Sequence, residues 1–188
     1  MHEIEPFHRW AKYYNCYTDP KSPFFNTGNS GHDYVDTIYG YYIHPSWDNI
    51  GSETLYVKVL YCNYAISFAV IELFGEWNDT LHNDIMFLKR NVVDKMVKYG
   101  IKYYLLIAEN IFNFHGSDDC YYEEWFEDVE DGWIAILNNR DFVSHEMSKY
   151  RLDFYVNFGP HLELDNWRSG NPQQLFNFVE GKISRLLG

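Results

Sequence analysis

Residues 102–119, with the sequence KYYLLIAENIFNFHGSDD, constrain the fold more than any other stretch of the chain. The apolar run at 103–108 is typical of a strand buried on both faces of a sheet, and Gly100 before it is a suitable stop for a helix. Residues 113–119 then supply the Gly, Ser and Asp side chains that favour a turn and a helix start. We therefore predict a strand, a loop and a new helix in this order.

The loop of this unit carries the first candidate functional residues. In an open α/β sheet, binding groups commonly gather on the loops that follow the carboxyl ends of strands. His115, Ser117 and Asp118 lie on such a loop.

The chain after residue 54 alternates strands and helices, so we predict an α/β fold with a mixed, mostly parallel sheet flanked by helices and a hairpin at one side. The expected strands are at 55–61, 65–74 (ending at Gly75), 103–108, 133–137 and 152–158. The first expected helix begins at Asn78 or Asp79, and its apolar positions are Leu81, Ile85, Leu88, Val92 and Met96. Two further helices are expected at 119–129 and 140–150. A final helix is expected from Pro172, with Asn171 as its cap.

Residues 1–54 are predicted to form an N-terminal extension that packs on a domain at 55–188. Helical spacing of apolar residues predicts a short helix within 4–14, and Pro and Gly residues indicate a loop at 15–33. The aromatic-rich stretch 34–47 favours a strand. Its aromatic side chains either cover an edge of the sheet or form an exposed surface or pocket wall, and the sequence leaves this open; they are Tyr34, Tyr39, Tyr41, Tyr42 and Trp47.

Charge and cysteine content limit the classes of function. The net charge is −12, and residues 103–139 contain nine acidic and no basic side chains, so no nucleic-acid partner is expected. No stretch approaches the roughly 18 consecutive apolar residues of a membrane span, and the N-terminus lacks the apolar core of a signal peptide. Three separated cysteines predict neither a disulfide framework nor a zinc cluster, which favours the cytoplasm. Nucleotide-binding Gly-rich signatures are absent, and no cofactor is expected.

Three segments resemble the STAS domain of anti-sigma-factor antagonists and sulfate-transporter tails. AVIELFGEWND resembles that family's strand ending before its first helix, YLLIAENIFNFHGSDD its next strand and loop, and GWIAILNNRDFVSHEMSKYRLDFYVNFG its later strand, helix and closing segment. In anti-sigma-factor antagonists the loop reads Asp-Ser-Ser-Gly, and a partner kinase phosphorylates its second Ser. The resemblance therefore implies Ser117 as a candidate phosphoacceptor, with Asp118 in place of the family's Gly.

Each candidate residue also has a structural interpretation. Ser117 is either a phosphosite or a turn hydroxyl at a helix start. The acidic run at 118–131 is either a docking face for a basic partner or the solvated side of a helix. His44, His82 and His115 belong to no metal-binding motif, and Cys120 and Ser117 belong to no nucleophile motif, so neither a metal nor a catalytic site is predicted.

We expect a non-catalytic regulatory or adaptor protein that binds a protein partner, basic in character or a regulatory kinase, through residues 113–131. Homo-oligomerisation is left open. The alternative is a small-molecule-binding protein or an enzyme with a pocket near His115 and the N-terminal aromatic residues. The predicted partner-binding residues are His115, Asp118, Asp119, Tyr121, Tyr122, Glu123 and Trp125, with the aromatic side chains serving as anchors if exposed.

Overall fold

A five-stranded sheet forms the centre of the protein in the computed structural model, which describes residues 2–27 and 37–187. Its order is β4-β5-β6-β7-β8; β4, β5 and β6 pair antiparallel, whereas β6, β7 and β8 pair parallel. The strands are β4 (Asp48–Asn49), β5 (Leu55–Asn63), β6 (Phe68–Asn78), β7 (Tyr103–His115) and β8 (Trp133–Leu137). A small second sheet contains β1 (His2–Ile4), β3 (Tyr41–Ile43) and β2 (Thr37–Ile38), in this order.

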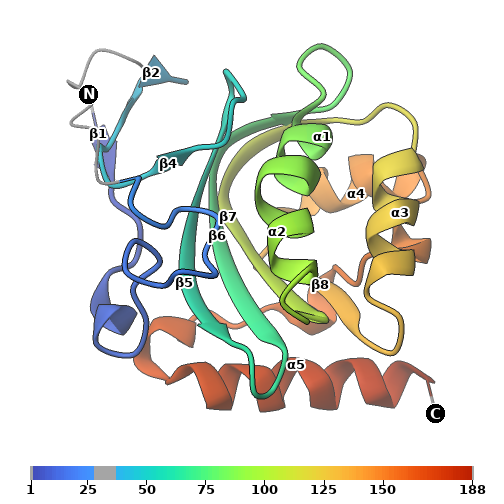
Figure 1. Ribbon diagram of the computed structural model, residues 1–188. Coiled ribbons are helices and arrows are strands. Elements are labelled where there is room, and N and C mark those ends of the chain that lie inside the picture. The colour runs from blue at the N-terminus through green and yellow to red at the C-terminus, as the bar shows by residue number, and fades with distance from the viewer. Residues whose placement is uncertain (1, 28–36, 188) are drawn as a thin grey trace.

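Helices cover both faces of the large sheet (Figure 1). One face packs against α1 (Asp84–Leu88), the π-helical turn η2 (Lys89–Val93), α2 (Asp94–Val97), α3 (Cys120–Asp128) and α4 (Asp141–Lys149). The other face packs against α5 (Pro172–Leu187) and against the 3-10 turns η1 (Arg9–Lys12), η4 (Pro160–Leu162) and η5 (Trp167–Ser169). The mixed α/β class predicted from the sequence is therefore confirmed.

Strand β7 lies in the interior of the sheet, as its apolar run predicts. Successive side chains of a strand point to opposite faces. Tyr104 and Leu106 belong to the core beneath α1–α4, whereas Leu105 and Ile107 belong to the core beneath α5. All four are fully buried, so the strand stabilises both layers at once.

Several predicted elements are present at or near their predicted positions. The antiparallel hairpin is β5 and β6, and the later elements α3, β8, α4 and α5 correspond to the predictions for 119–129, 133–137, 140–150 and the final helix. The start of α5 is capped in both directions: Gln174 N donates to Asn171 Oδ1 at 2.9 Å, and Asn171 N donates to Gln174 Oε1 at 3.0 Å. This reciprocal arrangement satisfies backbone donors that a helix start leaves free.

Two predicted elements near the chain ends are wrong. Residues 4–14 form no α-helix, because Ile4 pairs with Ile43 in the small sheet and only the turn η1 follows. Residues 152–158 form no strand, but the 3-10 turn η3 (Leu152–Phe154) and a single bridge between Asn157 and Ala135. Val156 N donates a hydrogen bond to the carbonyl of Leu152 at 2.9 Å, a contact between residues four apart that a helical turn makes and an extended strand cannot.

Two boundaries around β6 also differ from the predictions. Gly75 does not end the strand, because Glu76 to Asn78 continue to pair with β7; instead Gly75 adopts φ +115° at an irregularity in the ladder. The first helix starts at Asp84 rather than at Asn78 or Asp79, and Leu81 is exposed before it. Asn78 and Asp79 accept hydrogen bonds from the backbone amides of Leu81 and Ile85, so they hold the turn that precedes the helix.

The stretch predicted as a strand at 34–47 contains β2 and β3, while residues 34–36 lie outside the described residues. In the described part of the chain, no helix is long and apolar enough to cross a membrane. Cys16, Cys62 and Cys120 are all unpaired.

Candidate functional site

The loop between β7 and α3 is held between neighbouring elements. Thr80 Oγ1 donates a hydrogen bond to the carbonyl of Gly116 at 2.6 Å. On the other side, the ring of Tyr150 at the end of α4 lies so close that a Cβ on Gly116 would meet it at 2.5 Å. A glycine at 116 therefore permits this contact, and the loop has a defined position.

His115 is the last residue of β7 and not, as the sequence predicts, part of the loop, whereas Ser117 lies on the loop two residues later, and the two differ in their contacts. The His115 ring is about half exposed; its Nε2 lies 2.9 Å from Asn113 Nδ2 and 3.4 Å from Glu76 Oε1. Ser117 is partly buried, and within the described residues its hydroxyl makes no hydrogen bond with another side chain. The N-cap residue of α3 is Asp119 and not Ser117, and no side-chain cap hydrogen bond forms there.

The two acids after Ser117 make local contacts. Asp118 accepts a hydrogen bond from Cys120 N at 3.2 Å, and hydrogen bonds from Cys120 lower the pKa of its carboxyl. The same interaction raises the pKa of the exposed Cys120 thiol, which is the opposite of what a cysteine nucleophile requires. Asp119 accepts a hydrogen bond from Tyr155 Oη at 3.0 Å.

The inner side of α3 is structural. Tyr122 and Trp125 are 1% and 0% exposed, so neither predicted anchor can contact a partner. Tyr122 Oη donates to Asp79 Oδ2 at 2.6 Å, and the ring of Trp125 packs edge-on against Tyr104. Tyr121 is partly buried beneath the guanidinium of Arg90, 5.2 Å from the ring centroid.

Two acids on α3 are neutralised by cations from η2. Arg90 forms a bidentate ion pair with Glu124, and hydrogen bonds from Arg90 lower the pKa of that carboxyl to about 2. Lys89 Nζ lies 2.7 Å from Asp128 Oδ2, although the Lys89 side chain is completely buried. This contact was missed in the sequence, where Lys89 follows Ile85 by four residues and thus falls on the buried side of the helical repeat.

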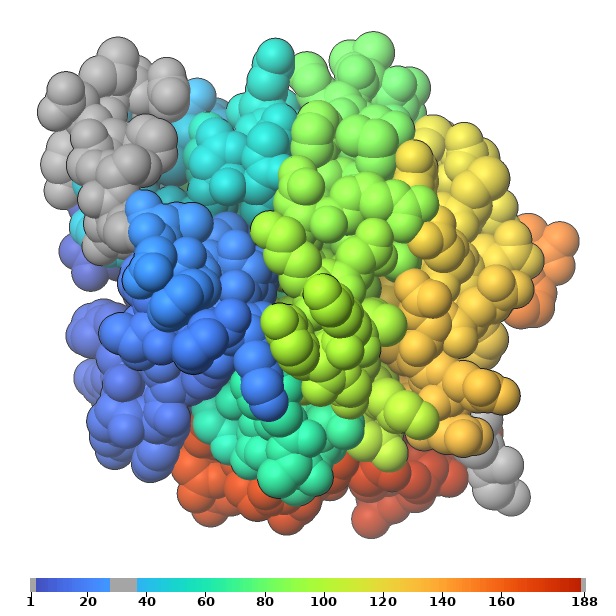
Figure 2. All heavy atoms as spheres, in the orientation of Figure 1, coloured from blue at the N-terminus to red at the C-terminus, as the bar shows by residue number. Residues whose placement is uncertain are grey.

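The outer side of α3 and its neighbouring turns keep their negative charge. Five exposed carboxylates make no ion pair with any described cation, and we call them, with the half-exposed ring of Phe126, the acidic face: Asp118, Glu123, Glu127, Glu130 and Asp131. Phe126 lies on the outer side of α3 and packs edge-on against Tyr155. Figure 2 shows α3, in yellow, at the surface beside the green α1–α2 segment.

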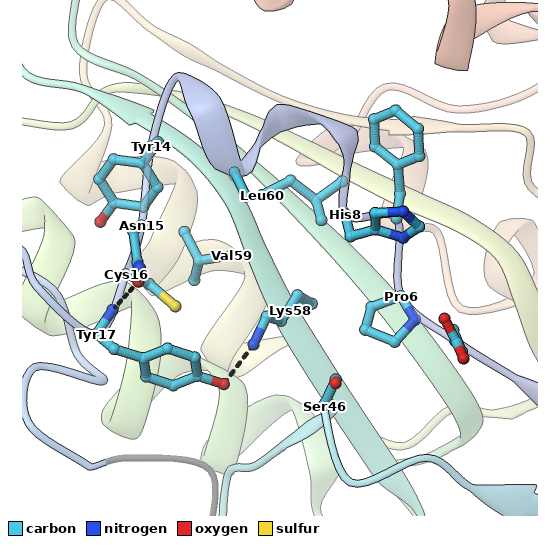
Figure 3. A pocket seen from close by; sticks show the side chains of 13 residues that line it. Pro6, His8, Tyr14, Asn15, Cys16, Tyr17, Ser46, Lys58, Val59 and Leu60 are labelled. Atoms are coloured by element: carbon cyan, nitrogen blue, oxygen red, sulfur yellow. Dashed lines mark hydrogen bonds between the residues drawn. The ribbon is translucent and has the colours of Figure 1, made fainter.

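A cavity of about 450 Å³ lies in a different part of the protein from His115 (Figure 3). It is bordered by the segment before and after η1, by Ser46 and by β5. The aromatic residues named for the alternative function do not line it: Tyr41 stacks on Phe112 and Tyr39 donates to Glu76. Tyr34 lies outside the described residues.

Among the described residues, two groups of side chains have metal-like spacing, but their members already contact other protein groups. Asp94, Glu124 and Asp128 surround the Lys89 ammonium, which occupies the position that a cation would take. In the second group, Nδ1 of His44 accepts a hydrogen bond from Ser46 N, so the proton of the neutral ring is on Nε2. That Nε2–H faces Glu3 and Glu5 and is not a free metal ligand.

Comparison with known proteins gives a structural similarity but no match to a family or a curated protein. No model of a known protein family matches the chain, and no curated protein matches it. Among solved structures, the phosphorylated form of the Bacillus cell fate determinant SpoIIAA is similar with a TM-score of 0.41 and 10% sequence identity. The match covers 65% of this chain and 98% of SpoIIAA. At this level of similarity, no residue role is carried from one chain to the other.

Proposed function

We propose that this chain is a non-catalytic regulatory or adaptor protein that binds a basic segment of a partner protein on the acidic face. The single observation that carries the proposal is the group of five exposed carboxylates of the acidic face, which form no ion pair with a cation of the described residues. Glu124 and Asp128, by contrast, are neutralised within the fold.

Charge and apolar contact have separate roles in this proposal. Clustered carboxylates attract a basic segment during encounter and disfavour acidic competitors. The half-exposed ring of Phe126, supported by Tyr155, supplies an apolar contact at the centre. Aromatic side chains contribute most of the binding free energy in many interfaces.

We further propose a STAS-like core at 55–188 covered by an extension at 1–54, in a protein of the cytoplasm. The order of elements from β5 to α4, a hairpin followed by alternating helices and parallel strands, supports this assignment. The loop carrying Ser117 lies directly before α3, where that family has its phosphorylated Ser.

A pair of charge variants tests the proposal. One variant removes four charges of the acidic face: Glu123→Gln, Glu127→Gln, Glu130→Gln and Asp131→Asn. The matched control removes four exposed charges elsewhere: Glu53→Gln, Asp153→Asn, Glu163→Gln and Asp165→Asn. Both variants have the same net charge, so nonspecific effects of charge are equal.

Proteins captured from the native host by the wild-type chain and by both variants are quantified, and captured candidates are purified for affinity measurements. We expect one basic partner whose affinity falls at least tenfold for the acidic-face variant and stays within a few fold for the control. Its affinity for the wild type should fall with added salt, because exposed charges are screened. Equal binding by the two variants would exclude the acidic face as the docking site.

A further inference from the structure

The cavity shown in Figure 3 lies beside the outer edge of β5, where this strand lacks a neighbour. β4 pairs only with Tyr56 and Val57, so within the described residues the outer edge of β5 has no strand partner from Lys58 onward. An unpaired edge presents backbone N–H and C=O groups. The ladder between β5 and β6 also shifts register between Val59 and Tyr61, which marks a bulge at Leu60. The bulge allows three successive residues to border the cavity.

The walls of the cavity expose somewhat more apolar than polar surface. The apolar lining residues include Pro6, Phe7, Tyr14, Cys16, Val59 and Leu60, and the polar ones are Glu5, His8, Asn15, Tyr17, Ser46 and Lys58. Its volume of about 450 Å³ falls within the range typical of small-molecule sites, about 300–1,000 Å³. Burial raises the pKa of the Cys16 thiol to about 12, so this cysteine contributes an uncharged surface.

Lys58 supplies a polar group at the floor. Its ammonium donates to Tyr17 Oη and to Asp48 Oδ2, at 3.3 Å for the latter, and lies 4.2 Å from the centroid of the Tyr17 ring. Tyr17 Oη in turn donates to Asp48 Oδ1 at 2.6 Å. An ammonium has three donors, and the contacts with Tyr17 and Asp48 use two of them. One N–H of Lys58 therefore has no acceptor among these side chains.

The charged side chains around the cavity determine which kind of ligand it can bind. Asp48 neutralises Lys58, and the exposed Glu5 carboxylate stands at the rim, so an anionic ligand gains little and a second anion is repelled. A cation would compete with Lys58 itself for Asp48. An uncharged ligand with an acceptor oxygen can accept a hydrogen bond from the remaining Lys58 N–H without being repelled by Glu5 or competing with Lys58 for Asp48. An amide can also form hydrogen bonds with the unpaired backbone groups of β5.

We infer that this cavity binds a small, uncharged aromatic compound that carries an amide or carbonyl group, with its oxygen at Lys58 and its ring against the apolar wall. The site is separate from the acidic face, and its test does not depend on the function proposed above.

Four probes of one shape test the inference: benzamide, benzoate, benzylamine and toluene. Backbone amide shifts are followed by NMR during titration of the wild-type protein. We expect benzamide to shift amides of residues 5–17 and 58–60 in a saturable way, with a Kd of about millimolar for a molecule of this size. Toluene lacks the acceptor oxygen and should bind roughly tenfold more weakly, because it loses one hydrogen bond with the charged Lys58 donor. Benzoate and benzylamine should also bind more weakly than benzamide.

Two variants, one in η1 and one directly after it, distinguish binding in this cavity from binding elsewhere. Ala11 is exposed and lines the cavity, so Ala11→Trp fills the cavity without disturbing buried contacts. Tyr13 lies two residues away, exposed and outside the lining, so Tyr13→Trp is the matched control. Ala11→Trp should abolish the benzamide shifts, and Tyr13→Trp should keep them. Absence of saturable shifts, unchanged binding by Ala11→Trp, or tighter binding of benzoate than benzamide would overturn the inference.

Discussion

Lys89 Nζ lies 2.7 Å from Asp128 Oδ2, and this contact joins the π-helical turn η2 to the last turn of α3. Asp94 and Glu124 also contact the same ammonium. Burial acts to lower the pKa of Lys89, but hydrogen bonds to Asp128 and Asp94 outweigh it and raise the pKa above its ordinary value. The lysine therefore stays charged inside the fold and positions the helix that carries the acidic face.

Replacing Lys89 by Met should lower the free energy of unfolding by about 3 kcal/mol, because breaking a buried ion pair leaves carboxylates without a counter-charge. The carboxylates of Asp94 and Asp128 are about a third exposed, so water still solvates them after the lysine is removed. The expected loss of stability is therefore at the lower end of the range for a broken buried ion pair. Urea unfolding measures it. Lys149→Met is the control, since Lys149 forms an exposed pair with Glu146 and should change stability by less than about 0.5 kcal/mol. Equal stability of the two variants would contradict the role given to Lys89.

Glu72 predicts a pH dependence of stability. Burial raises the pKa of this carboxyl to about 7, although Phe7 N donates to Oε2 at 2.7 Å. Unfolded Glu titrates near pH 4.3, so between about pH 4.3 and 7 the folded state binds more protons than the unfolded state. Stability from this group is therefore present at low pH, falls as pH rises through this window, and is level above it.

Glu72→Gln stays neutral at every pH and should reduce this fall, by at most about 1.4 kcal/mol per pH unit. Part of the slope should remain, because burial raises the pKa of Asp79 to about 7 as well. Urea unfolding at pH 5, 6, 7 and 8 tests this, with the exposed Glu163→Gln as control. A variant with the wild-type slope would show that Glu72 titrates in its ordinary range.

Gly75 should be intolerant of a side chain. It has φ +115°, and a Cβ would lie 2.1 Å from the carbonyl oxygen of Thr54. That carbonyl is fixed, since it accepts a hydrogen bond from Glu76 N. Gly75→Ala should therefore cost more than the roughly 1–3 kcal/mol of an unfavourable backbone conformation alone. Gly40, at φ +81° with open space around it, is the control and should cost about 1 kcal/mol as Ala. Thermal unfolding compares the two, and equal losses would argue against the clash.

Binding of the proposed partner should depend on the acids beside Ser117 more than on its hydroxyl. Ser117→Ala should leave the affinity within a few fold, because the hydroxyl makes no hydrogen bond with another described side chain. The double variant Asp118→Asn with Asp119→Asn should weaken binding and flatten its salt dependence. The reverse order of effects, or phosphate on Ser117 in mass spectra of protein from its own host, would identify a phospho-switch instead.

The sequence predicts those parts of the fold in which local pattern and tertiary packing agree. The run at 103–108 is apolar at every position because β7 is buried on both faces, and Asn171-Pro172 marks the start of α5. At Gly75 the pattern misleads, since a glycine that normally ends a strand here serves a bulge within one. At 4–14 the helical spacing is overruled by the pairing of Ile4 with Ile43, a contact between residues far apart in sequence.

The two candidate sites also differ in how far the sequence predicts them. The acidic charge around α3 is visible in the sequence, but its division into neutralised and free carboxylates depends on Lys89 and Arg90, which come from another element. The cavity is not predictable at all from local pattern. Its lining comes from residues within 5–17, from Ser46 and from residues 58–60. The pairing of β4 with β5, which leaves most of the outer edge of β5 open, exists only after folding.

The strand order also separates the two proposed sites. The cavity borders β5, and α3 follows β7 and lies toward the other side of the sheet, across β6 and β7 (Figure 1). A small molecule in the cavity and a protein on the acidic face would not touch, so each would bind with the same affinity whether or not the other is present. A measured departure from this independence would equal the free energy by which the two sites are coupled through the fold.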